Sequence, residues 1–156
     1  MPTWTTPKQD WALNDVVNAG DMNAMGENLA YLKDGDARAA VTVAAAATSS
    51  SAWATLATLT VTTRGGEVLV GYSAAGYHTG GGRAYFDVAL DGTRLALNGS
   101  NGSFEATPGA TGTAQTVGFV LLLTEVSAGA HTLTIQWKTS AAGMNVLGGQ
   151  AWVIES

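Results

Sequence analysis

One stretch near the middle of the chain decides the fold class: Ala84-Tyr85-Phe86-Asp87-Val88-Ala89-Leu90-Asp91-Gly92-Thr93-Arg94-Leu95-Ala96-Leu97. Its first half alternates, so that Phe86, Val88 and Leu90 would lie on one face of a β-strand. Asp91-Gly92 is a two-residue turn signal, because both residues tolerate the positive φ values that tight hairpins need. The stretch therefore predicts a β-hairpin.

Patterns typical of β-strands continue on both sides of this hairpin. Residues 132–138 place Leu133, Ile135 and Trp137 on one face, with polar residues between them. Seven or eight such strands within about 104 residues match the scale of a β-sandwich or jelly roll. We therefore expect residues 53–156 to form a mainly β domain, a jelly-roll β-sandwich of about eight antiparallel strands. The other strands are predicted over residues 58–62, 67–72, 93–97, 113–126 and 150–155, with a short strand around Phe104.

Residues 1–36 differ in composition and predict an extended arm followed by one short α-helix. Pro2 and Pro7 favour extended backbone around themselves. Asn18 is a good helix N-cap, and Gly35 is a plausible stop. Between these signals four apolar residues are spaced by three, four and three positions, which makes a single stripe along a helix. They are Met22, Met25, Leu29 and Leu32.

The sequence does not determine which surface this apolar stripe packs against. A helix this short is marginal alone in water, so it must rest on its own β domain, on a copy of itself or on another protein. Residues 37–52 are rich in Ala, Thr and Ser and separate the helix from the β domain. They predict either a linker or a first strand that contains Val41 and Val43.

One predicted strand is apolar on both faces. Residues 117–123 contain a single Gly among apolar side chains, whereas a strand with one wet face should alternate. One face would fill the core, and the other would be covered by a partner or by a loop of the same chain. We expect Phe119, Leu121 and Leu123 to lie between copies of the chain.

Charge and composition exclude several classes of protein. The chain of 156 residues has 7 Lys and Arg against 12 Asp and Glu, a net charge of −5, and no cluster of basic residues that could neutralise phosphates. We therefore expect neither nucleic acid nor membrane as a partner. The absence of Cys excludes disulfides and thiolate metal sites. The polar first residues contain no apolar signal-peptide core, and the apolar runs are too short to cross a membrane.

No residue pattern points to catalysis. His78 and His131 lack metal-ligand partners at helical or hairpin spacing, and no nucleophile, base and oxyanion donors assemble. We expect no enzyme, no catalytic residue, no metal and no cofactor. The glycine-rich residues 76–83 are predicted to form a loop, in which Tyr77, His78 and Arg83 are candidates for binding a ligand such as a sugar.

Two segments carry a resemblance to a known family. The first consists of Thr3-Trp4-Thr5-Thr6-Pro7-Lys8, Trp11-Ala12, Asp15-Val16-Val17-Asn18-Ala19-Gly20-Asp21-Met22-Asn23 and Glu27-Asn28-Leu29-Ala30-Tyr31-Leu32. The second comprises residues 127–139 and 151–155 near the end of the chain. This first segment resembles the N-terminal run of many bacteriophage virion proteins, and the second is similar to their C-terminal jelly-roll modules. The chain departs from the family at Asn14, where Gly is frequent, and a turn tolerates that change.

The resemblance implies a structural protein of the virion, assembled in the host cytoplasm as a homotrimer. The N-terminal segment would attach it to the major capsid protein or to tail proteins, and the jelly roll would project outward. A short arm with one compact head favours a capsid decoration protein. The alternative is a tail-fibre or tail-tip receptor-binding protein that recognises host-surface carbohydrate. The attaching residues would be Trp4, Pro7, Trp11 and Val17 in the arm and Met22, Met25, Leu29 and Leu32 on the helix.

Overall fold

A computed structural model of the chain describes residues 22–25, 37–107, 109–110, 113–141 and 143–155. The chain divides into two units, Met1–Asp36 and Ala37–Ser156. In the first unit, residues 22–25 form one helical turn whose Met22 and Met25 are exposed. The other predicted arm and helix residues, Trp4, Pro7, Trp11, Val17, Leu29 and Leu32, lie outside the described residues.

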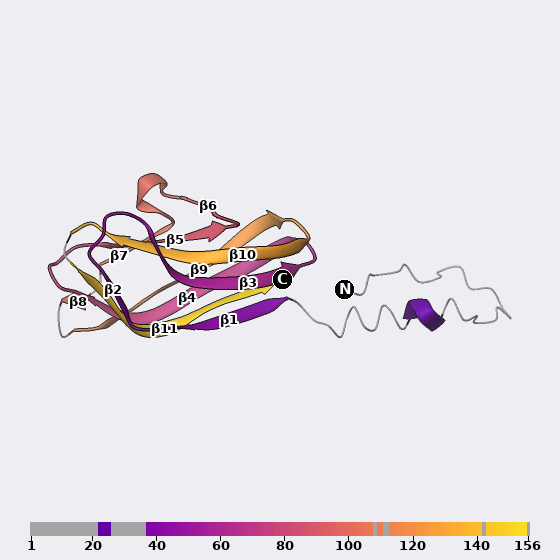
Figure 1. Ribbon diagram of the computed structural model, residues 1–156, viewed down its shortest axis with the longest axis horizontal. Helices are drawn as coiled ribbons and strands as arrows, with labels where there is room; N and C mark the ends of the chain where they lie inside the picture. Colours follow the sequence, from indigo (N-terminus) through magenta and orange to yellow (C-terminus); the bar gives the residue numbers. More distant parts are fainter. Residues whose placement is uncertain (1–21, 26–36, 108, 111–112, 142, 156) are drawn as a thin grey trace. The chain divides into compact units, whose positions relative to one another are not determined.

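The second unit is a sandwich of two β-sheets (Figure 1). Its elements are β1 (Arg38–Val43), β2 (Ala46–Thr48), β3 (Ala54–Thr63), β4 (Gly66–His78), β5 (Ala84–Leu90), β6 (Thr93–Arg94), the 3₁₀ turn η1 (Gly99–Asn101), β7 (Phe104–Ala106), β8 (Gly109–Ala110), β9 (Gln115–Val126), β10 (Gly129–Thr139) and β11 (Met144–Glu155). Residues 37–52, for which a linker and a first strand were both open, contain β1 and β2, and both pair with β11.

The strand order is that of a jelly roll. Sheet A has the order β1-β11-β4-β9, with β2 added on β11 and β8 added on β4. Sheet B has the order β3-β10-β5-β6, with β7 added on β5. Apart from the short strands β2, β7 and β8, the chain changes sheet at every step except the β5–β6 hairpin and so produces the two Greek keys of this fold. The predicted mainly β jelly-roll sandwich is confirmed.

The core lies between the sheets and is built by the alternation that predicted the strands. Leu133, Ile135 and Trp137 of β10 all face inward and are buried. At the centre Tyr72 of β4 packs between two phenylalanines, with ring centroids 5.4 Å from Phe86 and 5.8 Å from Phe119. The Tyr72 hydroxyl is buried without a hydrogen-bond partner among the described residues, and burial raises the pKa of this phenol well above its usual range.

The turn and the first strand of the hairpin that decided the fold class form as predicted, but the returning strand β6 covers only Thr93–Arg94 of the predicted residues 93–97 and has ended before Ala96, whose φ is 46°. Asp91 has a φ of 50° and Gly92 a φ of 83°, the positive values that a tight two-residue hairpin turn requires. The segment after β6 then folds back over the outer side of β5 (Figure 1). Among the described helical residues, none belongs to a helix long and apolar enough to span a membrane.

Candidate functional site

The loop predicted over residues 76–83 is shorter than expected, because Tyr77 and His78 belong to β4 and only Arg83 of the three candidate residues lies in the loop that follows. Side chains of β4 alternate between the faces of sheet A, so that Tyr77 faces outward and His78 faces the core. His78 is 1% exposed; its Nε2 lies 3.0 Å from Thr139 Oγ1, and its Nδ1 accepts hydrogen bonds from the backbone N–H groups of Gly80 and Gly82. His78 therefore anchors the glycine loop from inside, which corrects its prediction as a ligand residue.

Arg83, the third candidate residue, is exposed and paired on the surface. Its guanidinium donates to the carboxylate of Glu105 on the neighbouring β7. A pair at this exposure contributes little to stability. The loop therefore offers one charged group that is already partnered, one half-buried tyrosine and no further convergent polar group from the predicted set.

The most distinctive surface is the outward face of sheet A. Two rows of paired residues cross it: Trp152, Gly71 and Val120 in one, and Ile154, Leu69 and Leu122 in the other. We call the five side chains of these rows the outer apolar face. Val120, Leu122 and Ile154 are 59%, 46% and 42% exposed, although they are large apolar residues. Contiguous exposed apolar patches of this kind mark interaction sites.

Trp152 gives the outer apolar face its shape. A Cβ atom built on Gly71 would lie 2.1 Å from two atoms of the indole, so the ring lies directly over this glycine of the neighbouring strand. No residue other than glycine permits so close an approach. The indole therefore lies along the sheet, with the exposed Val120 on the strand beyond Gly71.

The face of β9 that is open to a neighbour differs from the predicted one. Phe119 and Leu123 point into the core and are buried, and Leu121 is partly buried against that core. Val120 and Leu122 carry the outward face instead. Since all these positions are apolar, the sequence contains no alternation that could have told the two faces apart. The predicted contact between copies stays a prediction, but Phe119, Leu121 and Leu123 are not its exposed residues.

A groove lined by leucines runs beside the inner side of β9. It has a volume of about 220 Å³ and lies between β9 and the segment around β6. Leu97 at its rim is 66% exposed. Its lining residues are Leu90, Leu95, Leu97, Leu121, Leu122, Leu123, Thr124 and Val126. The sequence did not single out this groove, because its two walls come from segments far apart in the chain.

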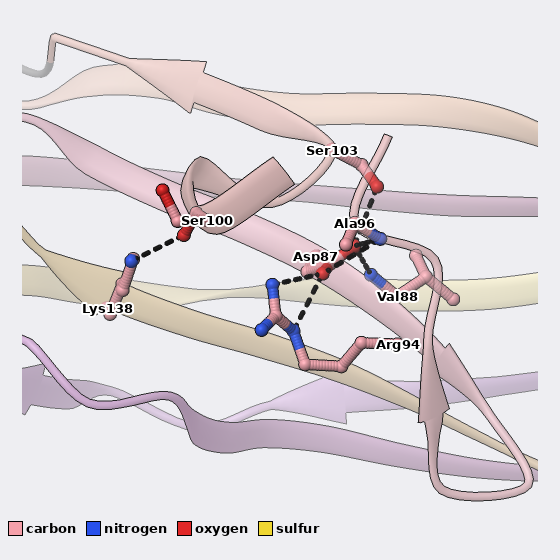
Figure 2. Close-up of polar contacts among 7 residues, drawn as sticks. All are labelled: Asp87, Val88, Arg94, Ala96, Ser100, Ser103 and Lys138. Atoms are coloured by element: carbon pink, nitrogen blue, oxygen red, sulfur yellow. Dashed lines mark hydrogen bonds and ion pairs between the residues drawn. The ribbon is translucent and has the colours of Figure 1, made fainter. Parts of the chain in front are cut away.

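A buried ion pair fixes the segment that folds over sheet B. Asp87 is fully buried, and its Oδ2 accepts from Arg94 Nε at 2.8 Å and lies 2.7 Å from Arg94 Nη2 (Figure 2). Its Oδ1 accepts from Ser103 Oγ and from the backbone N–H of Val88, and the N–H of Ala96 reaches both carboxylate oxygens. The Arg94 guanidinium also stacks over Trp53 at 4.0 Å. This cluster binds its own chain and leaves no open site.

Next to it, η1 is tied to β10. Lys138 Nζ donates to the carbonyl of Ser100 at 2.6 Å (Figure 2) and lies over the ring of Trp53 at 4.8 Å. Together with the ion pair, this contact covers the outer side of β5 with the chain itself. Apart from Leu97 at the rim of the leucine groove, the large exposed apolar side chains of the described β domain therefore lie on sheet A.

His131 connects two turns near the leucine groove. Its Nδ1 lies 2.7 Å from Asp91 Oδ2, and its Nε2 lies 2.8 Å from the carbonyl oxygen of Ser127. Both partners accept, so the ring satisfies both when it is protonated on both nitrogens. The bond to Asp91, followed by that to Ser127, raises the pKa of His131. The backbone N–H of Thr132, followed by His131, lowers the pKa of Asp91.

Among the described residues, no group of three or more His, Asp and Glu side chains lies together as a metal site would require.

No protein-family model matches the sequence, and no curated protein matches it either.

Solved structures with a similar fold include virus particles. The structure of infectious bursal disease virus, Gt strain, has a TM-score of 0.51 and 15% identity and covers 76% of this chain and 33% of its own. The structure of T=1 particles derived from infectious bursal virus has a TM-score of 0.51 and 16% identity, and the match covers 76% of this chain and 31% of the virus chain. A family 35 carbohydrate binding module from Clostridium thermocellum has a TM-score of 0.40 and 16% identity over 75% of this chain and 92% of its own. This chain spans about a third of the length of the virus chains that it matches.

Proposed function

We propose that this chain is a structural protein of a bacteriophage particle, a homotrimeric capsid decoration protein that binds the shell through residues 1–36. Its partners are other copies of itself and the major capsid protein of the same phage, and its location is the virion. The proposal includes no catalysis, no cofactor and no metal ion. It is supported by the resemblance of both ends of the sequence to phage virion proteins and by a fold that chains of virus particles share.

The outer apolar face is the single observation that carries the proposal. Burial of one large aliphatic side chain stabilises an assembly by roughly 1.5–3 kcal/mol. Leu69, Trp152 and Ile154, with the outward residues of β9, offer several such side chains on one side of one sheet. Packing this face against two other copies around a three-fold axis would remove it from water in each of them. An isolated chain would leave it exposed.

A second candidate function is that of a tail protein that recognises host-surface carbohydrate. The observation that favours it is Trp152, whose indole lies over Gly71 and is only partly covered. Flat aromatic rings at a protein surface are suited to stacking against sugar rings. In this case Trp152, with Gln150 and Ser73 in the adjacent paired row, would replace Tyr77, His78 and Arg83 as the binding residues.

The copy number in a particle tests the proposal and separates the two functions. Quantitative mass spectrometry of purified particles of the phage whose genome encodes this protein should count hundreds of copies per particle for a decoration protein. A few copies would favour the tail protein. Absence of the protein from purified particles would overturn both.

A further inference from the structure

The starting point is the free edge of β9. Within the described residues, β9 pairs with β4 along Gly66–Gly76 and with no strand on its other side. A free edge presents unpaired N–H and C=O groups that can pair with another strand. Proteins usually protect such edges with charged residues, proline or a covering segment. Residues 115–124 contain no charged residue and no proline.

The side chains on both faces of this edge are apolar as well. Val120 and Leu122 point outward and are about half exposed. On the inner side Leu121 borders the leucine groove, at whose rim Leu97 is exposed. A strand added at this edge would therefore meet apolar surface above and below its own backbone.

The opposite edge of sheet A is different. There β1 packs beside β3 of the other sheet and begins with the charged Arg38. The free, uncharged edge of the sheet is therefore at β9. A strand from another molecule that pairs with this edge must be equally uncharged.

We infer that β9 pairs antiparallel with β9 of a second copy of this chain, around a two-fold axis. The strand is complementary to itself, because one edge supplies both halves of such a contact. With Leu121 of the two copies at the centre, Val120 of each copy lies opposite Leu122 of the other, and Glu125 stays away from its counterpart. Copies with a net charge of −5 repel each other, and β9 is a place where they can meet without opposing carboxylates.

This contact goes beyond the proposed trimer. A two-fold contact cannot relate the copies around a three-fold axis, so it joins two trimers rather than the members of one. On a shell it would link neighbouring trimers over the surface. It requires only the described β domain of two copies, and it can therefore be measured without particles.

Disulfide trapping tests the pairing directly, because the chain has no cysteine of its own. The full-length variant Leu121→Cys, whose two cysteines would face each other at the centre of the seam, is oxidised, with Leu147→Cys as the control. Leu147 is 54% exposed and lies near the start of β11, away from the residues of β11 that pair with the middle of β4. We expect disulfide-linked pairs for Leu121→Cys and none for Leu147→Cys. No linkage on β9, or equal linkage at Leu147, would overturn the inference.

A second measurement does not depend on disulfide geometry. Hydrogen exchange of the β9 amides should slow as the protein concentration rises, and Leu121→Lys should raise the concentration needed for this protection at least tenfold, since two lysines then face each other across the seam. An equal mixture of Leu121→Lys and Leu121→Glu should associate better than either alone, because the two opposite charges then meet at the centre of the seam. Amides that exchange at the same rate at every concentration would overturn the pairing. The trimer is tested separately by substitutions at Ile154, so either contact can fail without the other.

Discussion

The burial of Asp87 is determined by the segment that covers it and not by its position in the alternating pattern of β5. It occupies an outward position on β5 and yet is fully buried, because the segment that carries Arg94 and Ser103 closes over it. Breaking a buried ion pair strongly destabilises a fold, since it leaves the remaining charge without compensation. We regard this pair as the main attachment of the β6–β7 segment.

We expect Asp87→Ala to lower the free energy of unfolding by about 3 kcal/mol, measured by urea denaturation. Glu105→Ala, which removes the exposed pair with Arg83, is the control and should change it by less than about 1 kcal/mol. Equal losses for the two variants would contradict the structural role given to Asp87.

The pair of His131 and Asp91 predicts a pH dependence of stability. The pKa of His131 is raised above its ordinary 6.5 in the folded chain. Its contribution is therefore fully present below pH 6.5 and is lost as the pH rises through the folded pKa. Asp91, whose pKa is lowered from 3.8, contributes above that value and loses its contribution as the pH falls through its folded pKa.

The measurement is the free energy of unfolding across pH, in wild type and in His131→Gln. We expect the difference between the two proteins to shrink as the pH rises above the folded pKa of His131. A difference that stays constant through neutral and alkaline pH would show that the protonated ring is not what holds the two turns together.

At the scale of the element, the alternation of polar and apolar residues predicted where strands lie, but it did not predict which face of β9 is buried. β10 and the β5–β6 hairpin follow from the sequence because polar and apolar residues alternate and the turn residues are specific. On β9 the alternation is absent, so Phe119, Leu121 and Leu123 could not be told from their outward neighbours. Likewise the glycines after His78 predicted a loop, but not that this histidine reaches under it from β4.

The contact of Trp152 with Gly71 connects β11 to β4 and was not predicted, because it depends on cross-strand register. We expect Gly71→Ala to displace the indole, to change tryptophan fluorescence and to destabilise the domain by about 1–3 kcal/mol through overpacking. Ser73→Ala, exposed on the same face of β4, is the control and should be nearly neutral. An unchanged fluorescence spectrum for Gly71→Ala would contradict this packing.

At the scale of the whole molecule, the hydrophobic core cluster is drawn from the jelly-roll unit, as far as the chain is described. We therefore expect the fragment of residues 37–156 to keep its circular dichroism spectrum and thermal midpoint, and to lose binding to purified particles. Full-length chain is the control for binding. A fragment that still binds particles would contradict the assignment of attachment to residues 1–36.

The molecule as described leaves an apolar side of sheet A uncovered, and the proposed function depends on other copies covering it. Light scattering of the purified full-length protein, coupled to size exclusion, measures this most directly. At low concentration we predict a particle of three times the chain mass, which falls to smaller species in Ile154→Glu and persists in Leu147→Glu. A wild-type protein that remains a stable monomer at every concentration would contradict the account.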